Sequence, residues 1–161
     1  YYGNPMSEHG DRHLELAGLG RLLTMSGRVN LDAVMAMNFR PVFGAQNIYE
    51  LPINVDGLKT KHQVASRLRG KHLFGEKVTY NLLAGRLNSR AEIKSTLLTA
   101  EYGLEAYAAS YAGRHLLLFA IDPEGRLQIY TEVPSFTAEP GWRVISLVEP
   151  EAETEAETTV G

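Results

Sequence analysis

The sequence contains no cysteine and only one tryptophan among its 161 residues. The absence of cysteine excludes disulfides, thiolate nucleophiles and Cys-ligated zinc, and it fits a reducing compartment such as the cytoplasm. No apolar run approaches the roughly 18 residues that span a bilayer, and the N-terminus lacks the basic and apolar stretches of a signal peptide. We therefore expect this stretch of chain to be soluble.

Net charge is also low, at −3, and its sign comes from the C-terminal tail. Five of the 19 acidic residues lie at alternate positions from Glu149 to Glu157, where no basic residue accompanies them, so removing them leaves 14 acids against 16 Lys and Arg. A body so close to neutral argues against nucleic acid as a partner. With 44% hydrophobic residues, the chain is long and apolar enough to bury a core.

Complete motifs for phosphate, metal or nucleophilic chemistry are missing. Gly18-Leu19-Gly20 precedes a predicted strand instead of opening a helix, so it is typical of a helix C-cap, and neither G-x-G-x-x-G nor a Walker motif occurs elsewhere. His9 and His13 are spaced i, i+4 on a predicted helix, but no pattern specifies the further ligands that zinc requires. Because no nucleophile elbow or paired-carboxylate pattern appears, we expect neither a metal site nor an enzyme.

The first 53 residues alternate strands and helices. Residues 1–5 begin without methionine and predict the end of a strand followed by a turn, so we expect a longer polypeptide upstream. A helix from Ser7 toward Gly18 or Gly20, a strand over Arg21–Ser26, a helix opened by Asn30 and a strand over Asn47–Ile53 follow. Pro41 should end or kink the second helix. Its predicted inward stripe consists of Leu31, Val34, Met35, Asn38 and Val42.

The composition of the chain changes after residue 53. Residues 54–72 are polar and basic, which favours a linker over the alternative of a strap for anionic groups. After it we predict a helix, a strand, a second helix, a hairpin around Asp122–Gly125 and a last strand. Trp142 should cover the core of this part. These elements span, in order, Thr79–Leu87, Ala91–Leu97, Tyr102–Tyr111, His115–Ile121 with Arg126–Val133, and Arg143–Val148.

Together these patterns predict an α/β protein. A partial Rossmann-like parallel sheet with the order β-α-β-α-β should occupy 1–53, and a basic linker 54–72. A smaller α+β unit with an antiparallel hairpin should occupy 73–149, and a disordered acidic tail 150–161.

Read in order, the segments Tyr2-Gly3-Asn4, Leu22 to Ser26 with Asn30, and Phe43-Gly44 with Ile48 to Leu51 resemble the second half of an RCK-type (TrkA-N-like) Rossmann domain. The segments KHLFGEKVTYNLLAGRL, IKSTLLTAEY, LLLFAIDPEGRLQIY and PGWRVISLV are similar to the cytoplasmic C-terminal region of bacterial CPA-type sodium or potassium/proton antiporters. The resemblance covers roughly residues 1–149 and depends on the order and spacing of these segments.

This resemblance implies a regulatory domain on the cytoplasmic face of the bacterial inner membrane. A transmembrane antiporter domain would precede it in the same polypeptide, and it would form a homodimer and modulate monovalent cation transport through a bound ligand or partner. A nucleotide such as NAD(H), ATP or AMP would lie across the strand ends of the full-length parent. Gly3 and Asn4 would lie near its adenosine, and Thr24, Ser26 and Asn30 near its ribose or phosphates.

The first strands, glycine loop and acidic ribose ligand of such a domain are not in this sequence. We therefore expect no cofactor in the fragment itself, which should bind nucleotide poorly. Two alternatives remain at this stage: a fragment of a stand-alone Rossmann-like dinucleotide-binding oxidoreductase, and a dimerisation module without a ligand.

Overall fold

The computed structural model describes Ser7, residues 16–52 and residues 70–151. They belong to two compact units, each built on a sheet of its own. Unit 1 extends to Asn81 and also takes in Thr131–Val133, and unit 2 comprises Leu82–Tyr130 and the chain from Pro134 onward. The predicted α/β class is confirmed at this level, because the first sheet is parallel and the second is antiparallel.

The parallel sheet of unit 1 has the order β1-β2-β3, with β1 at Leu22–Thr24, β2 at Ile48–Glu50 and β3 at Lys71–His72. The first two strands are those predicted, although shorter. The third is a correction, because Lys71 and His72 were expected to end the basic linker. A two-residue strand of basic side chains carries no hydrophobic alternation, and it is recognised only by its backbone pairing with Tyr49 and Glu50.

Helix α2, Val29–Phe43, connects β1 to β2 and is followed by a short 3-10 turn, Ala45–Asn47. It begins one residue before Asn30, with Arg28 at the N-cap and no side-chain cap, so Asn30 does not open it. Pro41 lies in its last turn, and Gly44, with φ of 75°, ends it by donating its N–H to the Arg40 carbonyl at 2.9 Å.

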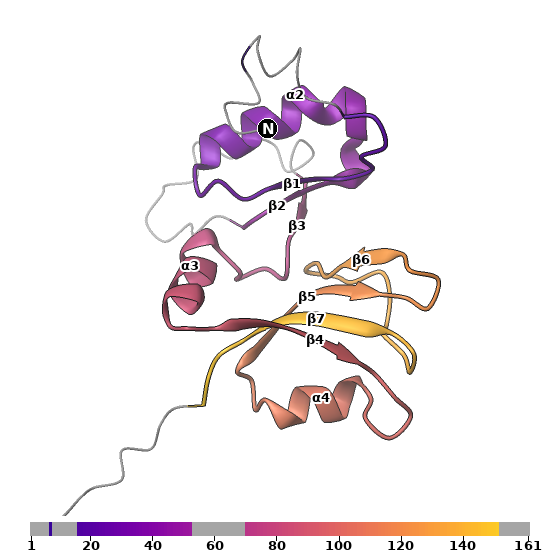
Figure 1. Cartoon of the computed structure of the whole chain (residues 1–161). Helices are drawn as coiled ribbons and strands as arrows, with labels where there is room; N and C mark the ends of the chain where they lie inside the picture. The colour runs from indigo at the N-terminus through magenta and orange to yellow at the C-terminus, as the bar shows by residue number, and fades with distance from the viewer. Residues whose placement is uncertain (1–6, 8–15, 53–69, 152–161) are drawn as a thin grey trace, which may run out of the picture. The chain divides into compact units, whose positions relative to one another are not determined.

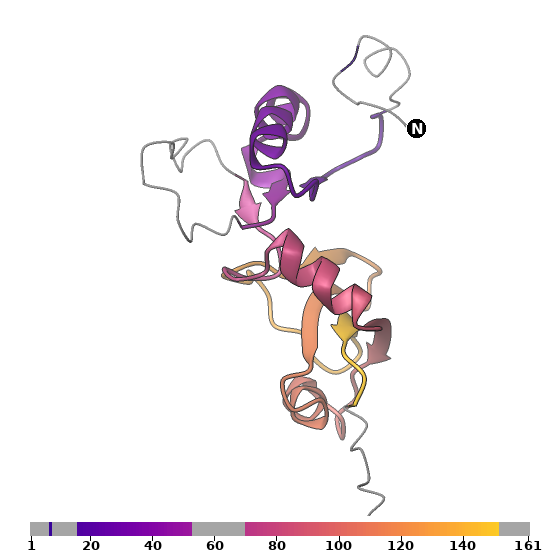
Figure 2. The same ribbon diagram turned by 90° about the vertical axis from the view of Figure 1, so that its left-hand side faces the viewer.

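The inward face of α2 was predicted wrongly except at Met35, which packs against the core. Val34 and Val42 are 50% and 57% exposed, whereas Ala36, Phe39 and Phe43 are buried and pack with Ile48. At about 100° per residue, the face formed by Ala36, Phe39 and Phe43 is rotated by roughly a third of a turn from the centre of the predicted stripe. The helix has apolar residues on both faces, so its periodicity could not tell which one the sheet would cover. Figures 1 and 2 show α2 lying along one side of the strands of unit 1.

Unit 2 contains an antiparallel sheet of order β4-β7-β5-β6, and the predicted elements of this part are present. The hairpin is confirmed between β5 and β6, but residues 131–133 leave the sheet and belong to unit 1. The elements are α3 at Tyr80–Asn88, β4 at Glu92–Leu97, α4 at Leu104–Ser110, β5 at His115–Ile121, β6 at Leu127–Ile129 and β7 at Arg143–Val148.

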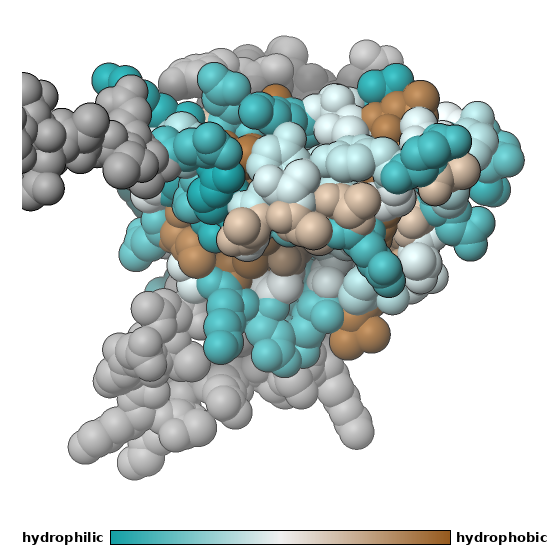
Figure 3. Space-filling view, turned by 90° about the horizontal axis from the view of Figure 1, so that it is seen from below, coloured by the Kyte–Doolittle hydropathy of each residue, from teal (hydrophilic) through white to brown (hydrophobic). Residues whose placement is uncertain are grey.

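The core of unit 2 forms where α4 packs on the sheet through Tyr107, which is fully buried together with Val144 and Leu98. The Tyr107 hydroxyl is hydrogen-bonded to that of Ser146 on β7. Trp142 lies against this core and stacks on Phe136 with 5.7 Å between ring centroids, as its predicted covering role requires. Seen from the side of α4, the surface is mostly hydrophilic or neutral (Figure 3).

Within the described parts of the chain, none of the helices has both the length and the apolar composition needed to cross a bilayer.

Candidate functional site

The three parallel strands of unit 1 end in polar residues that stand side by side. Thr24 on β1 pairs with Glu50 on β2, and Glu50 pairs with His72 on β3. Lateral neighbours in a sheet project from the same face, so a hydroxyl, a carboxylate and an imidazole form one row at the carboxyl edge. We call these three residues the carboxyl-edge row. In open α/β sheets, ligands bind outside the carboxyl ends of the strands.

The carboxyl-edge row projects from the face of the sheet that α2 covers. Leu22 and Ile48 precede Thr24 and Glu50 by two residues on their strands and pack against the core of α2, so all four side chains share that face. Thr24 and Glu50 are 2% and 7% exposed. The Thr24 hydroxyl donates a hydrogen bond to the Tyr49 carbonyl at 3.3 Å. This bond orients the Thr24 side chain and occupies its hydroxyl proton. Thr24 is therefore a buried positioning group and not an activated nucleophile.

Two exposed residues that sequence reasoning assigned to a ligand follow β1: Ser26 in the loop to α2, and Asn30 in the first turn of α2. The Ser26 N–H donates to Asp32 Oδ1 at 3.2 Å, and the Ser26 hydroxyl accepts from the Arg28 N–H at 3.1 Å. Asp32 lies in the first turn of α2, where its negative charge meets the positive end of the helix dipole. This arrangement favours a hydroxyl-rich group over a phosphate at this helix terminus, because Asp32 would repel an anion.

Gly27 holds the same loop close to the first residue of α3. Its φ is 70°, and an added Cβ would come within 2.8 Å of the Tyr80 ring. Only glycine combines this left-handed conformation with so close an approach to the ring. The exposed Tyr80 side chain thus lies over the backbone of the loop and provides a flat apolar surface beside Ser26.

At the β3 end, His72 leads into a cluster of acidic groups. His72 Nδ1 lies 3.0 Å from Glu132 Oε2, and Leu73 forms an antiparallel bridge with Thr131, so the 131–133 segment is attached to β3. A side-chain hydrogen bond with Glu132, together with the repulsion between the two carboxylates, raises the pKa of Glu76 above its ordinary range. Glu76 therefore holds its proton more readily than an isolated glutamate does.

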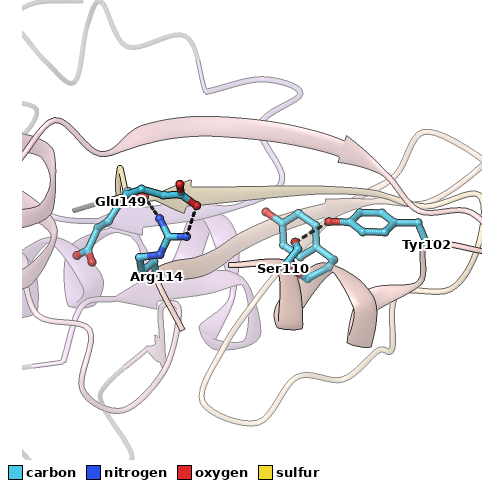
Figure 4. A network of polar contacts seen from close by, with 6 residues as sticks. Tyr102, Ser110, Arg114 and Glu149 are labelled. Atoms are coloured by element: carbon cyan, nitrogen blue, oxygen red, sulfur yellow. Dashed lines mark hydrogen bonds and ion pairs between the residues drawn. The ribbon is translucent and has the colours of Figure 1, made fainter. Parts of the chain in front are cut away.

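A second polar cluster lies in unit 2, where β7 ends and β5 begins. Arg86 Nε forms an ion pair with Glu149 at 3.0 Å, and Arg114 reaches both the Glu149 carbonyl at 3.5 Å and Glu151 at 2.9 Å. Burial, and secondly the charge of Arg86, lower the pKa of His115. Figure 4 shows Arg114 against Glu149, and separately the Tyr102 hydroxyl at 2.7 Å from that of Ser110. The ion pairs of Arg86 and Arg114 connect α3 and the start of β5 to the end of β7, which is a structural role, although Arg86 Nη1 and His115 Nδ1 are buried without a hydrogen-bond partner.

Thr24, Ser26 and Asn30 lie at or shortly after the carboxyl end of β1, and their assignment to a ligand stays a prediction. Gly3 and Asn4 lie outside the described residues, as do His9 and His13. The sequence reasoning missed Glu50 and His72. A charged residue directly before Leu51-Pro52 at the end of a strand was the available signal for Glu50, whereas His72 had none, because its strand was taken for linker.

Among the described residues, no group of three or more His, Asp and Glu side chains is arranged to hold a metal ion. The chain was also compared with protein-family models, curated proteins and solved structures, and none of them matches it.

Proposed function

We propose that this chain is a cytoplasmic regulatory region of a monovalent cation:proton antiporter, and that it responds to a nucleotide-type effector bound at the carboxyl edge of its parallel sheet. The observation that carries the proposal is the carboxyl-edge row, Thr24, Glu50 and His72, in register on three parallel strands. The order of segments that resembles RCK-type domains gives the antiporter context.

Different residues near the carboxyl edge suit the ribose and the base of a nucleotide. Asp32 is an acceptor of the kind that binds ribose hydroxyls, and the exposed Ser26 and Asn30 side chains add neutral donors and acceptors. The Tyr80 ring offers a stacking surface for a base. The acidic character of the edge favours the nucleoside end of the effector there, with its phosphates directed away from Asp32 and Glu50.

Regulation then requires two states of the domain that the effector stabilises differently. The Rossmann-like character of unit 1, the homodimer and the position at the inner face of the bacterial membrane belong to the same proposal. None of its residues is assigned a chemical step, so the region acts on transport by binding alone.

The test uses the parent antiporter in everted membrane vesicles of a bacterial strain that lacks its own antiporters, with sodium- or potassium-driven proton flux as the readout. Removing residues 1–149 should abolish the response of flux to NADH, ATP or AMP and change its pH dependence. Unchanged flux under all these conditions would refute the proposal.

Point variants test whether the effector binds at this edge of the sheet. Ser26→Ala combined with Asn30→Ala should raise the effector concentration for half-maximal response about tenfold, the loss of one or two hydrogen bonds. Asn88→Ala, at an equally exposed amide on α3, is the matched control and should respond like the unmodified protein. If both variants respond equally to the effector, the effector does not bind at this edge.

A further inference from the structure

The outer edge of β4 is the longest strand edge of unit 2 that has no neighbour among the described residues. The strand stands at one end of the order β4-β7-β5-β6 and pairs only with β7. It is six residues long and contains neither proline nor a bulge in its pairing with β7. Such an edge is a template for another strand unless something blunts it.

The hydrogen bonds of Leu98 identify which β4 residues point outward. Leu98 donates its N–H to the Trp142 carbonyl at 2.8 Å and accepts from the Gly141 N–H at 2.9 Å, so its backbone faces the β7 side. Along an antiparallel strand the backbone groups alternate between the two sides. Lys94 therefore faces β7, whereas the N–H and C=O groups of Ile93 and Ser95 point to the open side.

The charged side chains of β4 are ordered so that two antiparallel copies of the strand can place opposite charges beside each other. Glu92 and Lys94 project from the α4 face of the sheet, and Lys94 Nζ lies 5.8 Å from the centre of the Tyr111 ring on that face. Ile93 and Leu97 project from the opposite face and are 67% and 49% exposed. The strand thus combines an open backbone edge, two opposite charges flanking one residue, and uncovered apolar side chains.

We propose that β4 pairs in antiparallel fashion with β4 of a second copy of this chain, about a twofold axis at Ile93. In this register Ile93 exchanges backbone hydrogen bonds with Ile93 of the copy, and Glu92 of each copy stands opposite Lys94 of the other. The Ser95 N–H meets the Ala91 carbonyl of the copy, while the Ala91 N–H is already bonded to the Arg86 carbonyl at 3.0 Å.

Charge selects this register over its neighbours. A twofold axis at Lys94 would place two lysines directly opposite each other, which is destabilising. An axis at Ser95 would pair Ile93 with Leu97 but would leave Glu92 and Lys94 without opposite charges. Lys94 therefore disfavours pairing with a strand that lacks an acidic residue opposite it, and β4 of a second copy supplies Glu92 at that position.

This inference specifies the surface of the homodimer in the proposed function and does not depend on the effector. The experiment is sedimentation equilibrium of the full chain over a concentration series, with circular dichroism to verify folding. Glu92→Lys and Lys94→Glu should each raise the dissociation constant roughly 30-fold, because both symmetry-related pairs change from attraction to repulsion. The double variant, with the two charges exchanged, should dimerise like the unmodified chain.

Mixing the two single variants is the decisive experiment. The mixture should form a heterodimer of near-normal affinity, because every residue 92 then again faces an opposite charge at residue 94. A chain that stays monomeric up to about 1 mM, or a dimer that neither single variant weakens, overturns the pairing. A heterodimer no stronger than the two homodimers also overturns it. A monomeric chain would remove the homodimer from the proposed function. The response of ion flux to the effector is measured separately, so it can fail or hold whatever the oligomeric state.

Discussion

The hydrogen bond between Tyr107 and Ser146 allows a quantitative test of how unit 2 is held together. Both residues are 0% exposed, and their hydroxyls join α4 to β7 across the core. Tyr107 is also hydrogen-bonded to Thr96 on β4. Removing one member of a buried pair costs more than the bond itself contributes, because the remaining hydroxyl stays buried without its partner.

From this geometry we expect Tyr107→Phe to lower the free energy of unfolding of unit 2 by about 1–3 kcal/mol, since Ser146 loses its partner. Ser146→Ala should cost about 1 kcal/mol, because the Tyr107 hydroxyl keeps Thr96. The double variant should cost about as much as Tyr107→Phe alone, which gives a coupling of about 1 kcal/mol in the double-mutant cycle.

The assay is urea unfolding followed by tryptophan fluorescence. Trp142 is the only tryptophan of the chain and stacks on Phe136 beside the core of unit 2, so its signal reports this unit. Tyr102→Phe removes a hydroxyl from an exposed hydrogen bond and is the control, with an expected cost below about 0.5 kcal/mol. Additive costs of the two core variants, within about 0.5 kcal/mol, would show that the bond does not couple α4 to the sheet.

Two further predictions concern pH. The pKa of Glu76 is raised in the folded state, so protonated Glu76 stabilises unit 1. This stabilisation is complete below the ordinary pKa of 4.5 and is lost as the pH rises through the folded-state pKa. Glu76→Gln keeps a hydrogen bond to Glu132 and has no proton to lose. It should therefore raise the melting temperature at pH 7 but not at pH 4, and an equal gain at both would contradict the raised pKa of Glu76. The pKa of His115 is lowered, so its contribution is present above its ordinary value of 6.5 and is lost as pH falls. His115→Gln should therefore flatten the loss of unit 2 stability between about pH 7 and pH 5, measured by tryptophan fluorescence, and an unchanged slope would exclude this histidine as its cause.

Much of the fold followed from local patterns. The apolar run between Gly20 and Gly27 predicted β1, the run over Asn47–Ile53 predicted β2, and the Pro-Gly turn at Asp122–Gly125 predicted the β5–β6 hairpin. These features depend on backbone preferences and hydrophobic periodicity within a few residues, which the sequence displays directly. The assignment of Thr24, Ser26 and Asn30 to a ligand site stays a prediction, and the sequence reasoning missed Glu50 and His72 at the same end of the sheet.

What the sequence alone determined is therefore the type and order of the elements, because helix and strand formation depend mainly on neighbouring residues. Tertiary structure decided which face of α2 is buried, since both faces are apolar and only the sheet selects between Phe39 and Val34. It also decided that Lys71 and His72 form a strand and that Glu132 meets His72. Those choices depend on backbone pairing and charge contacts between residues up to 60 positions apart, and no local pattern carries that information.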